Sequence, residues 1–323
     1  MALFSKCIGN KMRLTAILFL FALSTNAAYA NNLFDINAIM LYANKPPKPK
    51  GKKENPESLR ILTWNIQMLP RWAIKKGQQT RAKWIIDTLL KQDVDVIVFE
   101  EVFDIGIRGR LRLALFPRFP FQVGVQNKKW AWRQPNGVWV ISRVPLKHLK
   151  HIFFKSSYGT DGLANKGAVL VEGNKRGKKF QIVATHLQSM QEAGAVAVRK
   201  RQFEQIKTEL LDKYARIGVP QLLIGDLNTP RHLEAEYKNM LNCVGMCDTE
   251  LNDVRPFTWD KTNSWNTDYE EEPNSQLDYI LINAQRSLAK IKNLSIYRPT
   301  RLLENKKVDL ADHYGVIGDI LLE

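Results

Sequence analysis

The chain has 323 residues, of which 45% are hydrophobic, and its formal net charge is +16 at pH 7. This length allows one large domain with a sizeable core, and three cysteines without clustered histidines argue against a zinc site. The positive charge suits an anionic partner, either a phosphodiester backbone or an acidic lipid surface, and a solvated basic face without a partner is the third alternative.

Residues 1–30 have the pattern of an export signal. Three cations precede the apolar run Leu14–Leu23, and Ala28-Tyr29-Ala30 is a small-x-small cleavage site. The apolar run is too short to span a bilayer, which needs about 20 residues. We therefore expect cleavage after Ala30 and a secreted or periplasmic protein.

Residues 31–58 form a Lys/Pro-rich linker without a folding pattern, and the remaining domain covers residues 59–323. After cleavage of the signal the only cysteines are Cys243 and Cys247. In an oxidising compartment, two cysteines that close so short a loop indicate a local disulfide.

The first strands of the domain end on polar side chains. Leu59–Ile66 is apolar on both faces around its middle, as in a strand of a covered sheet, and it carries Asn65 near its end. Helical spacing of apolar residues predicts a helix over about Gln78–Lys91. The apolar strand Val94–Phe99 then runs into Glu100-Glu101, two acids that repel one another unless a cation or base lies nearby.

The middle of the domain repeats this pattern. Strands are predicted over residues 137–142, 168–172 and 180–186, and the last of them ends at His186. A long helix follows between Glu192 and Tyr214, and its basic cluster Arg199, Lys200, Arg201 and Lys207 is expected to be largely solvated.

The strand Val219–Ile224 ends in Gly-Asp-Leu-Asn-Thr-Pro, because Pro230 forbids its continuation. Asp226 and Asn228 are one residue apart, so they project to the same side of an extended chain and can share one small ligand. The alternative is an Asx turn that closes the strand.

Two later strands complete the set. Leu277–Ile282 carries Asp278 near its start, and Asp312-His313 precedes the strand Tyr314–Leu322. Strands interleaved with helices indicate an α/β fold, and their number suggests two sheets packed face to face.

The polar residues at the strand ends describe a possible site. Oxygen donors with few sulfurs suit a hard cation such as Mg²⁺, although other divalent cations are possible. Two histidines among carboxylates supply a base and an acid near neutral pH. Together these residues indicate metal-assisted hydrolysis of a phosphate ester.

Six ordered motifs, LTWNI, EEVFD, ATHLQ, GDLN, LDYI and ADHY, resemble those of the endonuclease/exonuclease/phosphatase superfamily. The resemblance runs from Leu59 to residue 323. It implies a four-layer α/β sandwich of the DNase I-like type, with two packed mixed sheets and the site at one edge of them.

Further segments resemble the bacterial secreted neutral sphingomyelinase branch of that superfamily. They are GQQTRA at 77–82, EVFD at 101–104, ANKG at 164–167, HLQ at 186–188, and TWD at 258–260 with Asn263-Ser264. This resemblance implies that the substrate is a membrane sphingolipid or phospholipid. The expected reaction is hydrolysis of sphingomyelin to ceramide and phosphocholine by in-line attack of water, and we expect a monomer.

The resemblance also assigns roles to individual residues. Glu101 would be the central Mg²⁺ ligand, supported by Asn65. Asp226 and Asn228 would position water and phosphate, with a second metal as one option, and Asp312 would bind metal or orient a histidine. His313 would be the general base held by Asp278, His186 would stabilise or protonate the leaving side, and Asn165, with Lys166, would contact phosphate oxygens.

Three positions depart from the sphingomyelinase pattern. Glu100 stands where a glutamine often precedes the metal glutamate, and Gly315 replaces a usual proline. Tyr297 is the only aromatic residue from 280 to 311, so we expect no lipid-inserting hairpin with exposed aromatics. Trp130 and Trp132, which lie among cations, are the alternative membrane contact, although core packing of one of them is an equal alternative.

Two other functions are compatible with these residues. The shared core chemistry and the positive charge also fit an exported DNase I-like nuclease, which would bind nucleic acid, or another phospholipase C or inositol phosphatase of the superfamily. A catalytically silent binder of membranes or proteins is the third alternative, and the complete set of acid, base and metal positions argues against it.

Overall fold

The computed structural model describes residues 57–129, 131–267, 273–283 and 285–322. The predicted export signal and nearly all of the linker therefore lie outside the described residues. None of the described helices is long and apolar enough to cross a membrane.

The first sheet has six strands in the order β10-β13-β1-β2-β4-β3. Central strand β1 is parallel to β2 and antiparallel to β13, so the sheet is mixed. Almost every residue of β1 and β2 is buried, as their continuous apolar sequences predict. The strands are β1 (Ser58–Met68), β2 (Val96–Val102), β3 (Phe121–Val123), β4 (Trp139–Ser142), β10 (Lys290–Tyr297) and β13 (Gly315–Leu321).

The second sheet has five strands in the order β5-β6-β7-β8-β9. Only the β7–β8 pair is parallel. The strands are β5 (Leu146–Phe153), β6 (Gly167–Lys175), β7 (Lys178–His186), β8 (Gln221–Asp226) and β9 (Asp278–Ile282).

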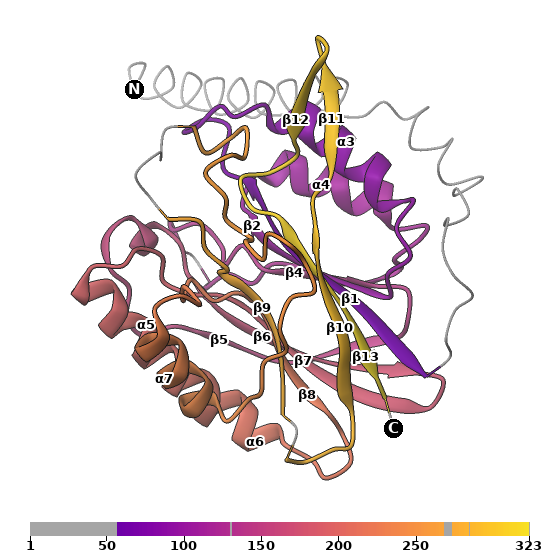
Figure 1. Cartoon of the computed structure of the whole chain (residues 1–323), viewed down its shortest axis with the longest axis vertical. Coiled ribbons are helices and arrows are strands. Elements are labelled where there is room, and N and C mark those ends of the chain that lie inside the picture. Colours follow the sequence, from indigo (N-terminus) through magenta and orange to yellow (C-terminus); the bar gives the residue numbers. More distant parts are fainter. Residues whose placement is uncertain (1–56, 130, 268–272, 284, 323) are drawn as a thin grey trace, which may run out of the picture. The chain divides into compact units, whose positions relative to one another are not determined.

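The two sheets pack face to face and are covered by helices on their outer sides (Figure 1). Side chains such as Val96, Ile182 and Val316 form the core between the sheets, whereas Phe203 and Met240 belong to a second core beneath the helices of the second sheet. The helices are α3 (Gln78–Leu89), α4 (Ile105–Leu115), α5 (Ala193–Ile206), α6 (Asp212–Tyr214) and α7 (Glu234–Val244), with the 3₁₀ helix η1 (Gly159–Leu163) and the π-helical turn η2 (Lys207–Leu211).

This arrangement confirms the predicted four-layer α/β sandwich. The predicted strands and the helix over 78–91 are also present, with ends that differ by a few residues. The predicted helix between Glu192 and Tyr214 is a single run of α5, η2 and α6, with a π-helical turn in its middle.

One other expectation is wrong. Cys243 and Cys247 are free cysteines. Cys243 packs against the core beneath α7, whereas backbone hydrogen bonds of 2.8 and 3.0 Å hold Cys247 to Ile282 of β9. Cys243 and Cys247 therefore contact different parts of the fold, and the expected disulfide between them is absent.

A two-stranded hairpin projects between the LDYI and ADHY motifs (Figure 1). It consists of β11 (Thr300–Leu303) and β12 (Lys306–Asp309), and it was not foreseen. Its exposed apolar side chains are Leu302 and Leu303.

Candidate active site

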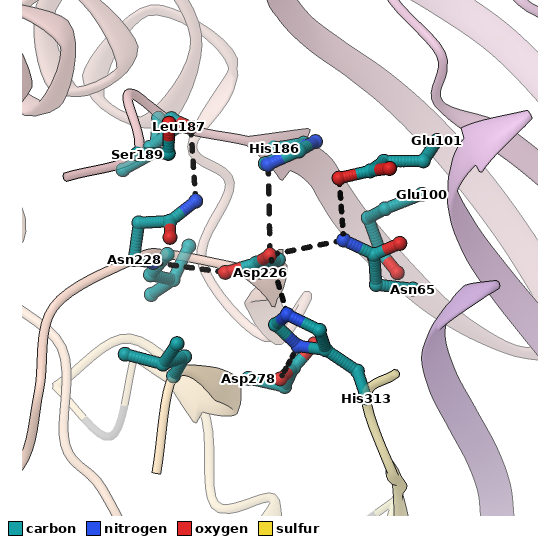
Figure 2. Close-up of polar contacts among 12 residues, drawn as sticks. Asn65, Glu100, Glu101, His186, Leu187, Ser189, Asp226, Asn228, Asp278 and His313 are labelled. Atoms are coloured by element: carbon teal, nitrogen blue, oxygen red, sulfur yellow. Dashed lines mark hydrogen bonds and ion pairs between the residues drawn. The ribbon is translucent and has the colours of Figure 1, made fainter. Parts of the chain in front are cut away.

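Polar side chains from both sheets meet at one edge of the sandwich (Figure 2). Each sheet supplies three of them from neighbouring strands, so neither sheet alone contains the cluster. The six residues are Asn65 from β1, Glu101 from β2, His313 just before β13, His186 from β7, Asp226 from β8 and Asp278 from β9.

The backbone is unusual where these strands end. Glu101 and Asn228 have φ angles of 58° and 50°, in the left-handed region that non-glycine residues rarely adopt. Gly225 has φ 141°, and a Cβ atom there would lie 1.9 Å from the carbonyl oxygen of Thr185. A glycine is therefore required before Asp226 to let β8 approach β7.

Two carboxylates face one amide at the centre of the cluster. Asn65 Nδ2 lies 3.1 Å from Glu101 Oε1 and 3.1 Å from Asp226 Oδ2. Burial and then the charge of Asp312 raise the pKa of Glu101, and burial and then Asp278 raise the pKa of Asp226 to about 7. Carboxylates that resist ionisation in this way would be stabilised by a hard cation, and their oxygen donors fit Mg²⁺.

The neighbouring acid Glu100 has a different environment. It is fully buried, and Thr63 Oγ1 donates a hydrogen bond of 2.8 Å to its Oε1. Burial and then Asp278 raise the pKa of Glu100 well above its ordinary value. Burial and Asp278 therefore both favour the protonated, neutral form of Glu100, at the position that departs from the resembled sphingomyelinase pattern.

His313 is held by an acid on one side. Its Nδ1 lies 2.9 Å from Asp278 Oδ2, and Trp64 Nε1 donates to its carbonyl oxygen at 3.0 Å. Burial opposes the imidazolium form, but Asp278 and Asp226 outweigh that effect and raise the pKa of His313 well above its usual value. Because Asp278 accepts the Nδ1 proton, Nε2 is the nitrogen free to exchange a proton.

Ligand atoms of Asp226, Asp278 and His313 lie within 4.8 Å of one another, so this trio could also hold a metal ion. Asp278 is fully buried and already engaged with His313, whereas Mg²⁺ usually keeps several water molecules. Glu101 and Asp226 both line an open pocket, and they suit a hydrated cation better.

His186 has a cation as its neighbour. Lys166 Nζ lies 3.1 Å from His186 Nε2 and donates to Asp161 Oδ2 and Leu187 O, each at 2.8 Å. Three contacts use all three lysine protons, so Nε2 of His186 accepts and its Nδ1 carries the proton. Burial and then Lys166 lower the pKa of His186 well below its usual value. The imidazole is therefore neutral, and the expectation that it donates a proton to the leaving side is less favoured than a stabilising role.

The other predicted site residues have separate positions. Asn228 donates from its backbone to Asp226 Oδ1 at 3.0 Å and from its side chain to Leu187 O at 3.1 Å. Asp312 accepts a hydrogen bond from Gln67 and lies close enough to raise the pKa of Glu101. The side chain of Asn165 instead donates to Asn127 at 2.7 Å, and it lines neither pocket of the site.

Of the two predicted membrane contacts, the structure describes Trp132 alone. Trp132 is 81% exposed, which excludes the core-packing alternative for this residue. Trp130 lies outside the described residues.

Arg199 corrects the prediction of a solvated basic cluster. Its side chain is fully buried, and it pairs with Glu236 of α7 at 2.6 Å. Its guanidinium also donates to Gln188 O at 2.7 Å, Met190 O at 2.9 Å and Gln191 Oε1 at 2.9 Å. Arg199 therefore braces the loop after His186. Its partners lie on other elements, so helical periodicity gave no signal for this role.

Two pockets adjoin the cluster and share Glu101, Asp161 and His186. The larger, which we call the acid-lined pocket, has a volume of about 950 Å³ and also contains Glu192 and Asp226. The smaller, which we call the apolar pocket, has a volume of about 430 Å³. Its apolar lining consists of Leu69, Pro70, Trp72, Ala73, Ile74, Phe103, Trp132, Leu163 and Ala164.

Residues 62–301 match the endonuclease/exonuclease/phosphatase family. Sphingomyelinase C 2 of Leptospira interrogans is 33% identical over 303 residues, covering 85% of this chain and 48% of the relative. Phospholipase C of Staphylococcus aureus is 30% identical over 258 residues, covering 72% of this chain and 76% of the relative.

Among solved structures, sphingomyelinase C of Streptomyces griseocarneus superposes with a TM-score of 0.71 at 28% identity, over 81% of this chain and 99% of that one. The chain spans about half the length of the Leptospira relatives that it matches. The family match covers most of the chain and includes both sheets, so the chain belongs to the endonuclease/exonuclease/phosphatase family.

Proposed function

We propose that this protein is a Mg²⁺-dependent phosphodiesterase that hydrolyses sphingomyelin to ceramide and phosphocholine. The names of its relatives, sphingomyelinase C and phospholipase C, support this class of substrate. The charge of the acid-lined pocket is the observation that carries the proposal.

The acid-lined pocket contains four carboxylate side chains and, among its described lining residues, no arginine or lysine. A cationic choline headgroup is attracted to the carboxylate charge that the divalent cation and Lys166 leave uncompensated, whereas the lining supplies no lysine or arginine for the successive phosphates of a nucleic acid. A nuclease binds the backbone through lysine and arginine contacts, which this lining does not supply. The pocket therefore favours the lipid headgroup over a nucleic acid.

The proposed reaction is in-line attack of water on phosphorus. Because the charges of Asp278 and Asp226 raise the pKa of His313, the neutral imidazole would be favoured when a divalent cation offsets Asp226. His313 Nε2 would then take the proton from water, and Asp278 holds the imidazole in the tautomer that leaves Nε2 free. A divalent cation held by Glu101 and Asp226, with Asn65 beside both, would neutralise the charge that develops on the phosphoryl oxygens. Asn228 orients Asp226 through its backbone amide.

On the opposite side of Asp226, His186 and Lys166 supply polar donors. The neutral His186 accepts a hydrogen bond from Lys166 and so orients its ammonium group, whose positive charge, partly offset by Asp161, would stabilise the leaving oxygen. We assign to Asp312 the role of raising the pKa of Glu101 through its charge. We assign to Asn165 the role of holding its loop through the hydrogen bond to Asn127. The protein would act as a monomer after export and removal of residues 1–30.

The test uses the purified protein with Mg²⁺, and then with EDTA, against sphingomyelin, phosphatidylcholine, inositol phosphates and plasmid DNA. We expect Mg²⁺-dependent release of phosphocholine, with sphingomyelin the best substrate. Cleavage of DNA that falls steeply with salt, without phosphocholine release, would instead identify a nuclease.

A further inference from the structure

Four exposed apolar side chains surround the mouth of the apolar pocket. Trp72 and Trp132 are both 81% exposed, Leu163 is 61% exposed and Ile74 is 42% exposed. They come from three segments that are distant in sequence. Large apolar side chains gathered on one exposed face mark an interaction site more often than chance.

The backbone beneath these side chains is firmly held. Arg71 donates to Asp104 through both its side chain and its backbone, at 2.9 and 3.1 Å, and this fixes the turn that carries Trp72. Gln78 Nε2 donates to Ile74 O at 2.6 Å. The outward direction of these apolar side chains is therefore built into the fold.

The segment that carries Trp132 is joined to the segment that carries Leu163. The backbone amide of Gln134 donates to Leu163 O at 3.0 Å, and the amide of Asn165 donates to Gln134 O at 2.9 Å. Two loops from different parts of the chain thus present Trp132 and Leu163 as one surface.

Exposed cations accompany the apolar side chains. Lys75 follows Ile74, Lys129 precedes Trp132 by three residues, and Arg133 stacks its guanidinium 5.4 Å from the ring centroid of Trp132. The ammonium of Lys128 lies instead 5.6 Å from the ring centroid of Phe153. Tryptophan with flanking lysine and arginine is the combination found at the boundary between lipid headgroups and hydrocarbon. The cations complement the phosphate layer of a bilayer, which a purely apolar protein partner would lack.

We propose that Trp72, Ile74, Trp132 and Leu163 form a docking surface for the surface of a choline-phospholipid bilayer. The choice of lipid rests on the proposed function. The apolar pocket shares Glu101 and His186 with the acid-lined pocket, so a lipid held at this surface needs to move only a short way to place its phosphate at the site. The docking surface contains no residue of the β11–β12 hairpin.

Binding is measured by co-sedimentation with sphingomyelin/phosphatidylcholine vesicles in EDTA, which prevents turnover. We expect the double variant Trp72→Ala/Trp132→Ala to bind at least about 10-fold more weakly, because two indoles no longer enter the interface. The matched control is Ile217→Ala/Val254→Ala, which removes two almost fully exposed apolar side chains that line neither pocket and should bind as the wild type does.

Activity gives a second measure. In Mg²⁺, we expect the tryptophan variant to lose at least ten times more activity on vesicles than on a water-soluble phosphocholine ester. Equal losses on the two substrates would show damage to the site itself and would overturn the docking role, as would wild-type vesicle binding by the tryptophan variant.

The hairpin provides the competing outcome. If Leu302→Ser/Leu303→Ser abolishes vesicle binding and Trp72→Ala/Trp132→Ala does not, the hairpin docks and the proposal is wrong. Failure of the proposed function has a different signature, because the wild type would then bind vesicles but release no phosphocholine from either substrate.

Discussion

Replacement of Arg199 by methionine tests how the loop beside the active site is held. The change keeps the length of the side chain but removes a buried cation whose Nε and Nη2 atoms lie 2.8 and 2.6 Å from Glu236 Oε1. It also leaves the carbonyl groups of Gln188 and Met190 without their donor. The Arg199→Met protein should therefore be less stable, and the loop after His186 should be held less firmly.

The expected loss of stability follows from the burial of the two charges. Removal of one partner of a buried ion pair costs about 3 to 5 kcal/mol, because the other charge remains buried and unpaired. Glu236 keeps 18% side-chain exposure, which places the cost near the lower end, at about 3 to 4 kcal/mol. For a domain of this size, the fall in Tm should be about 6 to 16 °C.

Thermal unfolding followed by circular dichroism measures this change. The exposed neighbour Lys200 provides the matched control, and Lys200→Met should change the free energy of unfolding by no more than about 0.5 kcal/mol. The double variant Arg199→Met/Glu236→Met should recover part of the loss, because it leaves no uncompensated charge.

Activity separates a positioning role from a purely structural one. Gln191, which Arg199 holds, donates to the backbone oxygen of Asn228 at 3.3 Å. Well below its Tm, the double variant with Glu236→Met should therefore still show about 10-fold lower kcat/KM, with the loss mainly in kcat. The reasoning is refuted if Arg199→Met unfolds at the same temperature as Lys200→Met, or if the recovered double variant has wild-type kcat.

Three further predictions concern the titratable groups. His313→Ala should lower kcat by about 10²- to 10⁴-fold while the protein stays folded. The control is His148→Ala, which removes an exposed histidine on β5 and should leave kcat unchanged. Near-full activity of the His313→Ala protein would remove His313 from the mechanism. Burial raises the pKa of Asp226 to about 7, so its protonated form stabilises the fold at low pH, and this contribution is lost as the pH rises through 7. The Tm of the metal-free protein should therefore fall between about pH 5 and 8. The increase in Tm caused by Mg²⁺ should grow over the same range. An Mg²⁺ effect of the same size at both pH values would contradict this linkage. Glu100→Gln should keep the wild-type Tm or raise it, since burial raises the pKa of Glu100 and so favours the neutral side chain, and a large fall in Tm would show that the carboxylate is charged.

Much of the site could be predicted because its residues follow short apolar strands. Asp226 stands after five buried residues and before a proline that ends the strand, so the local sequence alone places it at the edge of a sheet. His186 is located by the same reasoning, whereas Asp278 lies at the start of β9 and reaches the same edge because β9 is antiparallel to β8. The order of the strands depends on contacts between distant segments, so no local pattern reveals it. The ordered motifs of the resembled family indicated instead that these strand ends meet.

The elements that were missed lack a local pattern for physical reasons. Strand β5 is at the edge of its sheet, so its sequence LKHLKHIF carries exposed cations and histidines among few apolar residues. Helix α4 contains Gly109 and three arginines, which weaken its apolar stripe. The burial of Arg199 depends on Glu236, 37 positions later, and no window of a few residues contains both.

The division of the cluster between the two sheets affects how the protein matures. The indole of Trp64 donates to the carbonyl oxygen of His313 across a separation of 249 residues, so His313 reaches the cluster only when the last strands insert beside the first. A nascent or truncated chain that stops short of this closure has the acids of the cluster but not His313, so under the proposed function it would be inert. Contacts of such long range also slow folding, so the complete cluster forms late.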